Sequence, residues 1–300
     1  MKKFFAFVEI RTKIASLLPF LFGAAYAAYV YGRLRVAETA LFFFSMILFD
    51  MATTAINNTV DSKSGATLLP YRRSTAIAIL SVLLLLATAL GVALAIRTGP
   101  VVLLAGALCF FVGIFYTFGP APLSRMPLGE IFSGIFMGFF IPFLVVYVNA
   151  PDGTLVSLGY SAGILTLSMD VPALFRLAIA TIPAICGIAG IMLANNICDL
   201  ETDQKVGRYT LPHFIGTRHA LWLFAGLYAA AFASVAAMAV FRVLPAYVLL
   251  VLLAAIPTWK NLRTFFRRQS KADTFPLSVA DLVLVMVPLI AVAAVAAILG

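Results

Sequence analysis

The amino-acid sequence predicts an all-α polytopic membrane protein: a bundle of nine transmembrane helices with a central cavity that opens near the cytoplasmic face. Hydrophobic residues make up 63% of the 300 residues and charged residues only 11%, against about 45–50% and about 25% in soluble domains. Apolar runs of about 18 residues or more, the length that crosses a bilayer core, recur along the chain. Because these runs are continuous rather than alternating, an outer-membrane barrel is excluded. Residues 1–300 are expected to form a single transmembrane domain.

The nine apolar runs define the expected spans in chain order. They cover residues 14–32, 38–58, 75–96, 100–118, 128–149, 177–198, 219–240, 243–259 and 279–299. Residues 150–176 have a mixed composition that includes Asp152, Gly153, Asp170 and Pro172. A tenth span there would carry Asp170 and would need more length. This segment is therefore expected to be a long external loop, with at most a short interfacial helix.

The distribution of cations predicts which side of the membrane each loop faces. With a cytoplasmic N-terminus, the inside segments hold all but five of the 21 Lys and Arg residues. Those left outside are Arg33, Arg35, Arg97, Arg176 and Arg242. Cytoplasmic loops carry an excess of Lys and Arg, so this orientation is expected, in a multi-pass protein of the cell membrane. The net charge of +9 suits an anionic leaflet of the lipid bilayer and requires no nucleic-acid partner.

Two polar motifs interrupt the apolar sequence. The first, INNTVDSKSG (56–65), ends the second span, and the other, ANNICDLETDQKVGRYTLP (194–212), ends the sixth. Both contain the pattern Asn-Asn-x-x-Asp. Four crossings separate them, and an even number of crossings returns the chain to the same face. Both motifs are therefore expected on the cytoplasmic side, where they can meet.

The spacing within the motifs favours a shared helix face. Asn195, Asp199 and Asp203 follow one another at intervals of four, so on a continuous helix they would line one stripe over about 12 Å. Asn57 and Asp61 repeat the first interval in the other motif. Amide and carboxylate oxygens without adjacent His or Cys suit a hard cation such as Mg²⁺. These five residues are the expected metal ligands, and the three carboxylates are also expected to be catalytic.

Amides and cations beside these ligands are expected to contact the substrate. They are Asn58, Lys63, Arg72 and Arg73 around the first motif, and Asn196, Lys205 and Arg208 around the second. Acids that hold a metal and bases that hold phosphate oxygens together make a diphosphate clamp. The alternative is a pair of solvated interfacial loops, but acids at membrane depth are costly and usually functional.

A diphosphate clamp at the end of an apolar bundle suits an isoprenoid diphosphate, whose tail would lie between helices. Departure of the diphosphate leaves an allylic cation that an electron-rich acceptor attacks, and a dry pocket keeps water from quenching it. A transporter of an anionic or isoprenoid lipid is the competing function. It would predict ionisable residues at mid-membrane in several spans and inverted repeats, whereas only Asp50 is clearly deep.

These motifs resemble those of the UbiA superfamily of intramembrane prenyltransferases, and most closely its 1,4-dihydroxy-2-naphthoate branch. NNTVD and NNICDLETDQKVGRYTL are similar to the two aspartate-rich motifs of that superfamily. YTFGPAPLSRMPLGEIFSGIFMG (116–138) and RTKIASLLPFLFGAAYA (11–27) resemble two further stretches of the branch. One feature departs from the pattern: SKSGATLLP (62–70) lacks the acid that commonly follows the first motif, which leaves the number of metal ions open.

The resemblance implies a Mg²⁺-dependent transfer of a polyprenyl group from an allylic diphosphate to an aromatic acceptor. The acceptor implied is 1,4-dihydroxy-2-naphthoate, which loses its carboxylate in menaquinone biosynthesis; 4-hydroxybenzoate is the alternative. A non-catalytic relative that binds prenyl diphosphate is a third reading. The resemblance also implies that Lys63, Lys205 and Arg208 contact phosphate, with Arg11 as a further candidate.

Four other residues are candidates for the site. Asp50 lies about two turns deeper than Asn57 on nearly the same face, where it could orient the acceptor or accept its proton, or instead pair with a hydroxyl such as Thr54. Glu130 could act in catalysis or cap the fifth span. Tyr116 and Arg125 lie towards the cytoplasmic side and are expected to touch the substrate.

Overall fold

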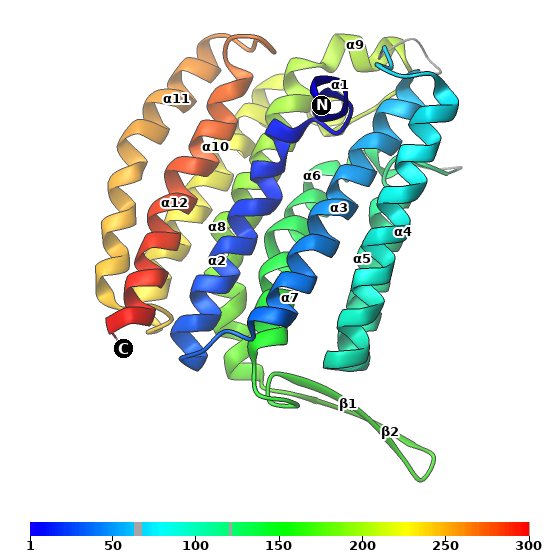
Figure 1. Cartoon of the computed structure of the whole chain (residues 1–300). Coiled ribbons are helices and arrows are strands. Elements are labelled where there is room, and N and C mark those ends of the chain that lie inside the picture. Colours follow the sequence, from blue (N-terminus) through cyan, green and yellow to red (C-terminus); the bar gives the residue numbers. More distant parts are fainter. Residues whose placement is uncertain (63–67, 120–121, 300) are drawn as a thin grey trace.

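The computed structural model describes residues 1–62, 68–119 and 122–299 and forms a bundle of long helices (Figure 1). Within these ranges, eight helical segments are long and apolar enough to cross a membrane, and a ninth, α5 (Pro100–Phe115), is apolar but shorter. The eight are the run of η1 (Ile10–Lys13) and α2 (Ile14–Tyr31), α3 (Val36–Asp61), α4 (Arg73–Thr98), the run of α6 (Gly129–Ser133), η4 (Gly134–Phe140) and α7 (Ile141–Asn149), α8 (Val171–Cys198), α10 (Leu211–Val240), the run of η5 (Ala246–Ala254) and α11 (Ala255–Arg267), and α12 (Phe275–Leu299). The predicted helical membrane bundle is confirmed.

The two ends of the bundle differ. The N-terminus, α1 (Lys2–Phe7) and α9 (Leu200–Lys205) lie at one end, and the C-terminus lies at the other (Figure 1). We call these the N-end and the C-end. The 3₁₀ turn η1 (Ile10–Lys13) leads into α2, and η3 (Leu123–Arg125) precedes α6. Because α3 ends at Asp61 and α8 ends next to α9, both polar motifs lie at the N-end, as the count of crossings predicts.

The segment expected as a loop at residues 150–176 connects two spans as predicted, but it contains a β-hairpin that lies outside the helical bundle. Strands β1 (Val156–Ser161) and β2 (Ile164–Met169) pair antiparallel around a turn with positive φ at Ala162 and Gly163. Apolar and small polar residues alternate in the strands, a period-two pattern that the loop interpretation overlooked.

Three helix limits differ from the expected spans by six residues or more. Helix α8 begins at Val171 instead of residue 177, because the Asp170 carboxylate accepts a hydrogen bond from the Ala173 amide at 3.0 Å and caps it. Helix α10 begins at Leu211 instead of residue 219 and contains a break at Gly216, whose φ of 76° favours glycine. The eighth span continues to Arg267 instead of residue 259, so basic residues occupy its last turns.

Helix α8 is central to the packing, because it lies against α10, α12 and η4. Its contact with η4, a π-helical segment, depends on the glycines of the Gly-x-x-x-Gly pattern at Gly134 and Gly138. A Cβ atom at Gly138 would lie 2.5 Å from the Ile185 Cα atom, and one at Gly134 would lie 2.9 Å from the Ile185 carbonyl oxygen. Small residues permit this close backbone approach between membrane helices.

We expect Gly138→Ala to lower the free energy of unfolding by about 1–3 kcal/mol, because backbone atoms of α8 would have to move. Gly226→Ala on α10 is the matched control, since a Cβ there meets nothing within 4 Å and alanine is the better helix former. Thermal unfolding in detergent measures both. Equal melting temperatures for the two variants would contradict the close η4–α8 contact.

Candidate active site

A cavity of about 700 Å³ lies inside the bundle, within the size range of ligand pockets. Its wall is mostly apolar and comes from η1, α2, α3, α4, α5, α6, η4, α7 and α8. On α3 the lining runs from Asn57 to Phe42, which corresponds to about 22 Å along the helix axis. The predicted central cavity is therefore present as a long apolar channel.

Aromatic rings cover one side of this channel. Phe132, Phe136 and Phe140 all line it and stack in a column, with ring centroids 5.9 Å and 5.0 Å apart. Polar residues gather instead at its N-end. They are Glu9, Thr12, Lys13, Ser16, Asp50, Thr53, Thr54, Asn57, Tyr116 and Ser133. The cavity thus has an apolar body and a polar N-end, which we call its mouth.

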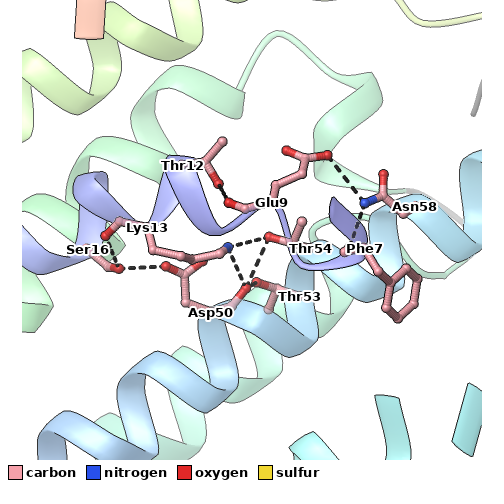
Figure 2. A network of polar contacts seen from close by, with 9 residues as sticks. All are labelled: Phe7, Glu9, Thr12, Lys13, Ser16, Asp50, Thr53, Thr54 and Asn58. Carbon is pink, nitrogen blue, oxygen red and sulfur yellow. Dashed lines mark hydrogen bonds and ion pairs between the residues drawn. The ribbon is translucent and has the colours of Figure 1, made fainter. Parts of the chain in front are cut away.

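Asp50 is the centre of a buried polar network in this mouth (Figure 2). The Lys13 ammonium group donates to a carboxylate oxygen of Asp50 at 2.7 Å, to its carbonyl oxygen at 3.0 Å and to the Thr54 hydroxyl at 2.5 Å. The Ser16 hydroxyl donates to the other carboxylate oxygen at 2.6 Å. The Asp50 carboxylate is therefore paired with Lys13 and Ser16 and not with the Thr54 hydroxyl, whose own proton goes to the Asp50 carbonyl.

Lys13 was not a candidate from the sequence, where it counts as one more cytoplasmic cation. The structure leaves only 5% of the residue exposed. A buried cation needs a partner of opposite charge, and the deep acid Asp50 was the signal that could have pointed to one.

Arg208 joins the two polar motifs at the N-end. Its guanidinium contacts the carboxylate of Asp61 from the first motif, and it lies 3.9 Å from the carboxylate of Asp203 in the second. Burial raises the pKa of the Asp203 carboxyl, and Arg208 opposes that effect by favouring the charged form. The convergence of motifs expected from the crossings is therefore a direct side-chain contact.

Lys271 makes a comparable contact with the second motif. It follows α11, and its ammonium group contacts both the Asn195 amide oxygen and the Asp199 carboxylate. Nothing in the sequence distinguishes this lysine from the basic residues around it, because its partners belong to the second motif, far away in the chain.

The expected metal ligands of the second motif lie on two helices instead of one continuous helix. Helix α8 ends at Cys198, Asp199 forms the joint, and α9 carries Asp203. The Asp199 amide still bonds the Asn195 carbonyl at 3.0 Å, and the Asp203 amide bonds the Asp199 carbonyl at 2.8 Å. Backbone hydrogen bonds between residues four apart therefore continue across the joint.

Three amides that were expected to face substrate or metal contact protein groups. Asn58 donates to the Phe7 carbonyl at 2.9 Å, and Asn196 donates to the Glu130 carboxylate at 2.9 Å. The Asn57 amide oxygen accepts a hydrogen bond from Thr117. Asn58 and Asn196 therefore tie segments of the bundle together, whereas Asn57 lines the cavity.

The remaining candidates are spread around the N-end. Tyr116 lines the cavity, with its hydroxyl 3.4 Å from that of Ser133. Arg11, Arg72, Arg73, Arg125 and Lys205 are exposed at or near this end of the bundle. Lys63 lies outside the described residues. Roles for these side chains in substrate binding stay predictions.

The donor set at the N-end fits Mg²⁺ only if the substrate completes it. In the described part of the chain, no group of three or more His, Cys, Asp or Glu residues is close enough to hold a metal ion. Mg²⁺ commonly takes one or two carboxylates and receives its other ligands from phosphate and water. The Lys271 ammonium group contacts the side-chain oxygens of Asn195 and Asp199, so a positive charge already lies at two of the expected metal ligands. Arg208 also keeps a buried Nε–H without a hydrogen-bond partner among the described residues.

Comparison with known proteins agrees with this architecture. The model of the UbiA prenyltransferase family matches residues 16–285. A curated relative, 1,4-dihydroxy-2-naphthoate octaprenyltransferase of Bacillus subtilis (strain 168), is 28% identical over 236 residues, which cover 74% of this chain and 68% of the relative.

Two solved structures share the fold at low sequence identity. A UbiA homolog from Aeropyrum pernix K1 has a TM-score of 0.67 at 19% identity, over 91% of this chain and 97% of that one. A UbiA homolog from Archaeoglobus fulgidus bound to GPP and Mg²⁺ has a TM-score of 0.66 at 15% identity, over 98% and 99%.

We expect Lys13→Met to lower the free energy of unfolding by about 3 kcal/mol, because it leaves the Asp50 charge buried without its partner. The double variant Lys13→Met/Asp50→Asn removes both charges and is expected to recover most of that loss. Denaturant unfolding in detergent micelles measures all three proteins. If the single and double variants are equally unstable, the loss comes from packing and not from charge.

Proposed function

The chain belongs to the UbiA prenyltransferase family, and from this premise we propose that it transfers a polyprenyl group from an allylic diphosphate to an aromatic acceptor. The observation that carries the proposal is the contact of Arg208 with Asp61, which brings the two aspartate motifs together at the polar mouth of an apolar cavity. Such a site suits a substrate with one highly charged end and one long apolar end. The alternative of a lipid transporter has no comparable support.

The diphosphate is proposed to bind between the motifs. Asp61, Asp199 and Asp203, with the amide oxygens of Asn57 and Asn195, would hold Mg²⁺. The ion would supply positive charge that stabilises the departing diphosphate. Arg208 and Lys271 already lie against these acids, so they are placed to turn towards phosphate oxygens when the acids bind a metal.

The prenyl tail is proposed to lie in the apolar channel. Its wall contains few polar groups beyond the mouth, so the tail gains contacts and water is excluded from the reacting carbon. The bond between the first prenyl carbon and the diphosphate oxygen breaks, and a ring carbon of the acceptor supplies the electrons for the new carbon–carbon bond. The ring then loses a proton, or a carboxylate as carbon dioxide.

The acceptor is proposed to sit deeper in the cavity than the diphosphate, near Lys13 and Asp50, which lies about two turns below Asn57 on α3. Asp50 keeps carboxylate lone pairs that can accept a hydrogen bond from a ring hydroxyl, while the Lys13 ammonium group holds the carboxylate in place. Glu130 is proposed to act from the side of the second motif, where it accepts a hydrogen bond from Asn196 and keeps one buried carboxylate oxygen without a hydrogen-bond partner among the described residues.

The sequence and the Bacillus subtilis relative support a specific acceptor and a specific orientation in the membrane. We propose 1,4-dihydroxy-2-naphthoate as the acceptor, in menaquinone biosynthesis, on the resemblance to the relative of that name; 4-hydroxybenzoate is the alternative. The distribution of cations supports a cytoplasmic N-end.

We expect Asp61→Asn and Asp199→Asn each to lower the rate of prenyl transfer about 100-fold or more, since each removes a charge that acts on the departing diphosphate. Purified protein is incubated with Mg²⁺, a polyprenyl diphosphate and a panel of aromatic acids, and products are identified by mass. Glu201→Gln on α9 is the control, because Glu201 is exposed and is expected to leave the rate within about twofold. Full activity in either Asp variant would remove that residue from the clamp.

We expect Gly106→Phe to shift the preference of the enzyme to shorter donors. Gly106 lines the cavity from α5, and a Cβ atom there meets nothing within 4 Å, so a larger side chain at this position has room to start into the channel. The ratio of kcat/KM for a long over a short prenyl diphosphate should fall about tenfold, a difference of about 1.4 kcal/mol. An unchanged ratio would mean that the tail does not pass Gly106.

A further inference from the structure

The hairpin of β1 and β2 projects obliquely from the C-end of the bundle, beyond the ends of the helices (Figure 1). Its register pairs Val156 with Met169, Leu158 with Leu167, and Tyr160 with Leu165. Directly opposite residues of an antiparallel pair share a face, so these six apolar side chains lie together. We call them the apolar hairpin face. The other face carries Ser157, Gly159, Ser161, Ile164, Thr166 and Ser168.

Much of the apolar hairpin face is uncovered by the protein. Tyr160 is 76% exposed, Leu165 66%, Leu167 58% and Met169 53%. A contiguous apolar surface of this kind marks a place where another apolar medium is in contact.

The position of the hairpin identifies that medium as lipid. Its base is part of the bundle, since Leu155 and Val156 are buried in one apolar cluster with Leu94 and Val102. No charged residue occurs between Asp152 and Asp170, which flank the hairpin and are both exposed. Asp152 pairs with Arg35 at 2.9 Å at the end of the spans, where the chain meets water. The apolar hairpin face thus continues the lipid-facing surface of the helices, and Tyr160 is a residue favoured at membrane interfaces.

The backbone limits how deep the hairpin can lie. Two strands leave outward-facing N–H and C=O groups along both edges, and open sheet edges do not occur in the hydrocarbon core, where no water can bond them. The headgroup–acyl boundary satisfies both constraints, because it offers apolar chains on one side and water on the other.

We propose that the hairpin lies in the interfacial layer of the bilayer at the C-end, with the apolar hairpin face on the acyl chains and the hydroxyl-bearing face towards water. This surface is separate from the transfer site, and the inference stands whether or not the proposed reaction is correct.

The test uses single tryptophans on adjacent residues of β2 that point to opposite faces. The chain has two tryptophans, Trp222 and Trp259, both exposed, and both are replaced by phenylalanine. Leu167→Trp then reports on the apolar face and Ser168→Trp on the other. The proteins are reconstituted in phosphatidylcholine vesicles that contain lipids brominated either near the headgroup or near the chain end. Aqueous iodide is the second quencher.

We expect bromines near the headgroup to quench Leu167→Trp at least about twofold more than bromines near the chain end, and iodide to quench mainly Ser168→Trp. Leu253→Trp, at a position 65% exposed on a bilayer-facing span, is the control for full lipid access. Leu165→Trp and Thr166→Trp repeat the comparison if the first pair disturbs the hairpin, and circular dichroism checks that every variant is folded.

Three outcomes would overturn the proposal. Equal quenching of both tryptophans by iodide would place the hairpin in water. Protection of Leu167→Trp from both quenchers would mean that a protein surface, such as a second copy of the chain, covers it. Stronger quenching by the deep bromines would place the strands in the hydrocarbon core.

Discussion

The contact of Arg208 with the Asp61 carboxylate is the interaction on which the polar end of this molecule depends. Asp61 ends α3, and Arg208 follows α9, so the contact spans 147 residues of sequence. Without a cation between them, the acids of the two motifs would repel one another at the edge of an apolar medium that screens charge poorly. The same arrangement serves the proposed chemistry. In the protein alone, Arg208 neutralises the carboxylates. When a divalent ion takes over that role, Arg208 can bind phosphate instead.

Buried charge is used sparingly elsewhere in the cavity. Lys13 and Asp50 form a neutral pair whose hydrogen-bonding groups are largely satisfied by Thr54, Ser16 and the main chain. The pair therefore places polar groups in the cavity mouth with no net charge. A neutral polar patch below a highly charged clamp separates the two ends of the proposed reaction: anion binding above, and ring recognition below.

The sequence alone predicted the parts of this protein that depend on local composition and on counting. Apolar runs predicted the helices, and the parity of crossings predicted that Asn57–Asp61 and Asn195–Asp203 share one end. It missed Lys13 and Lys271, because the importance of a cation depends on which acid lies beside it, and those acids are on other helices. It also missed the hairpin, since weak alternation in a short segment of mixed composition was interpreted as loop. The early start of α8 at Val171, ahead of residue 177, and the break at Asp199 depend on capping and tertiary packing, which composition does not report.

The π-helical geometry of η4 has a consequence for the wall of the channel. In an α-helix, side chains four residues apart drift round the axis in one sense, whereas the wider turn of a π-helix makes them drift in the other. The passage from α6 into η4 offsets the two drifts. Phe132, Phe136 and Phe140 therefore present a continuous strip of ring faces. Such faces carry partial negative charge but no lone pair that bonds covalently to carbon. An electron-deficient carbon at the top of this strip would be shielded by polarisable surface and kept from side reactions until the intended nucleophile arrives.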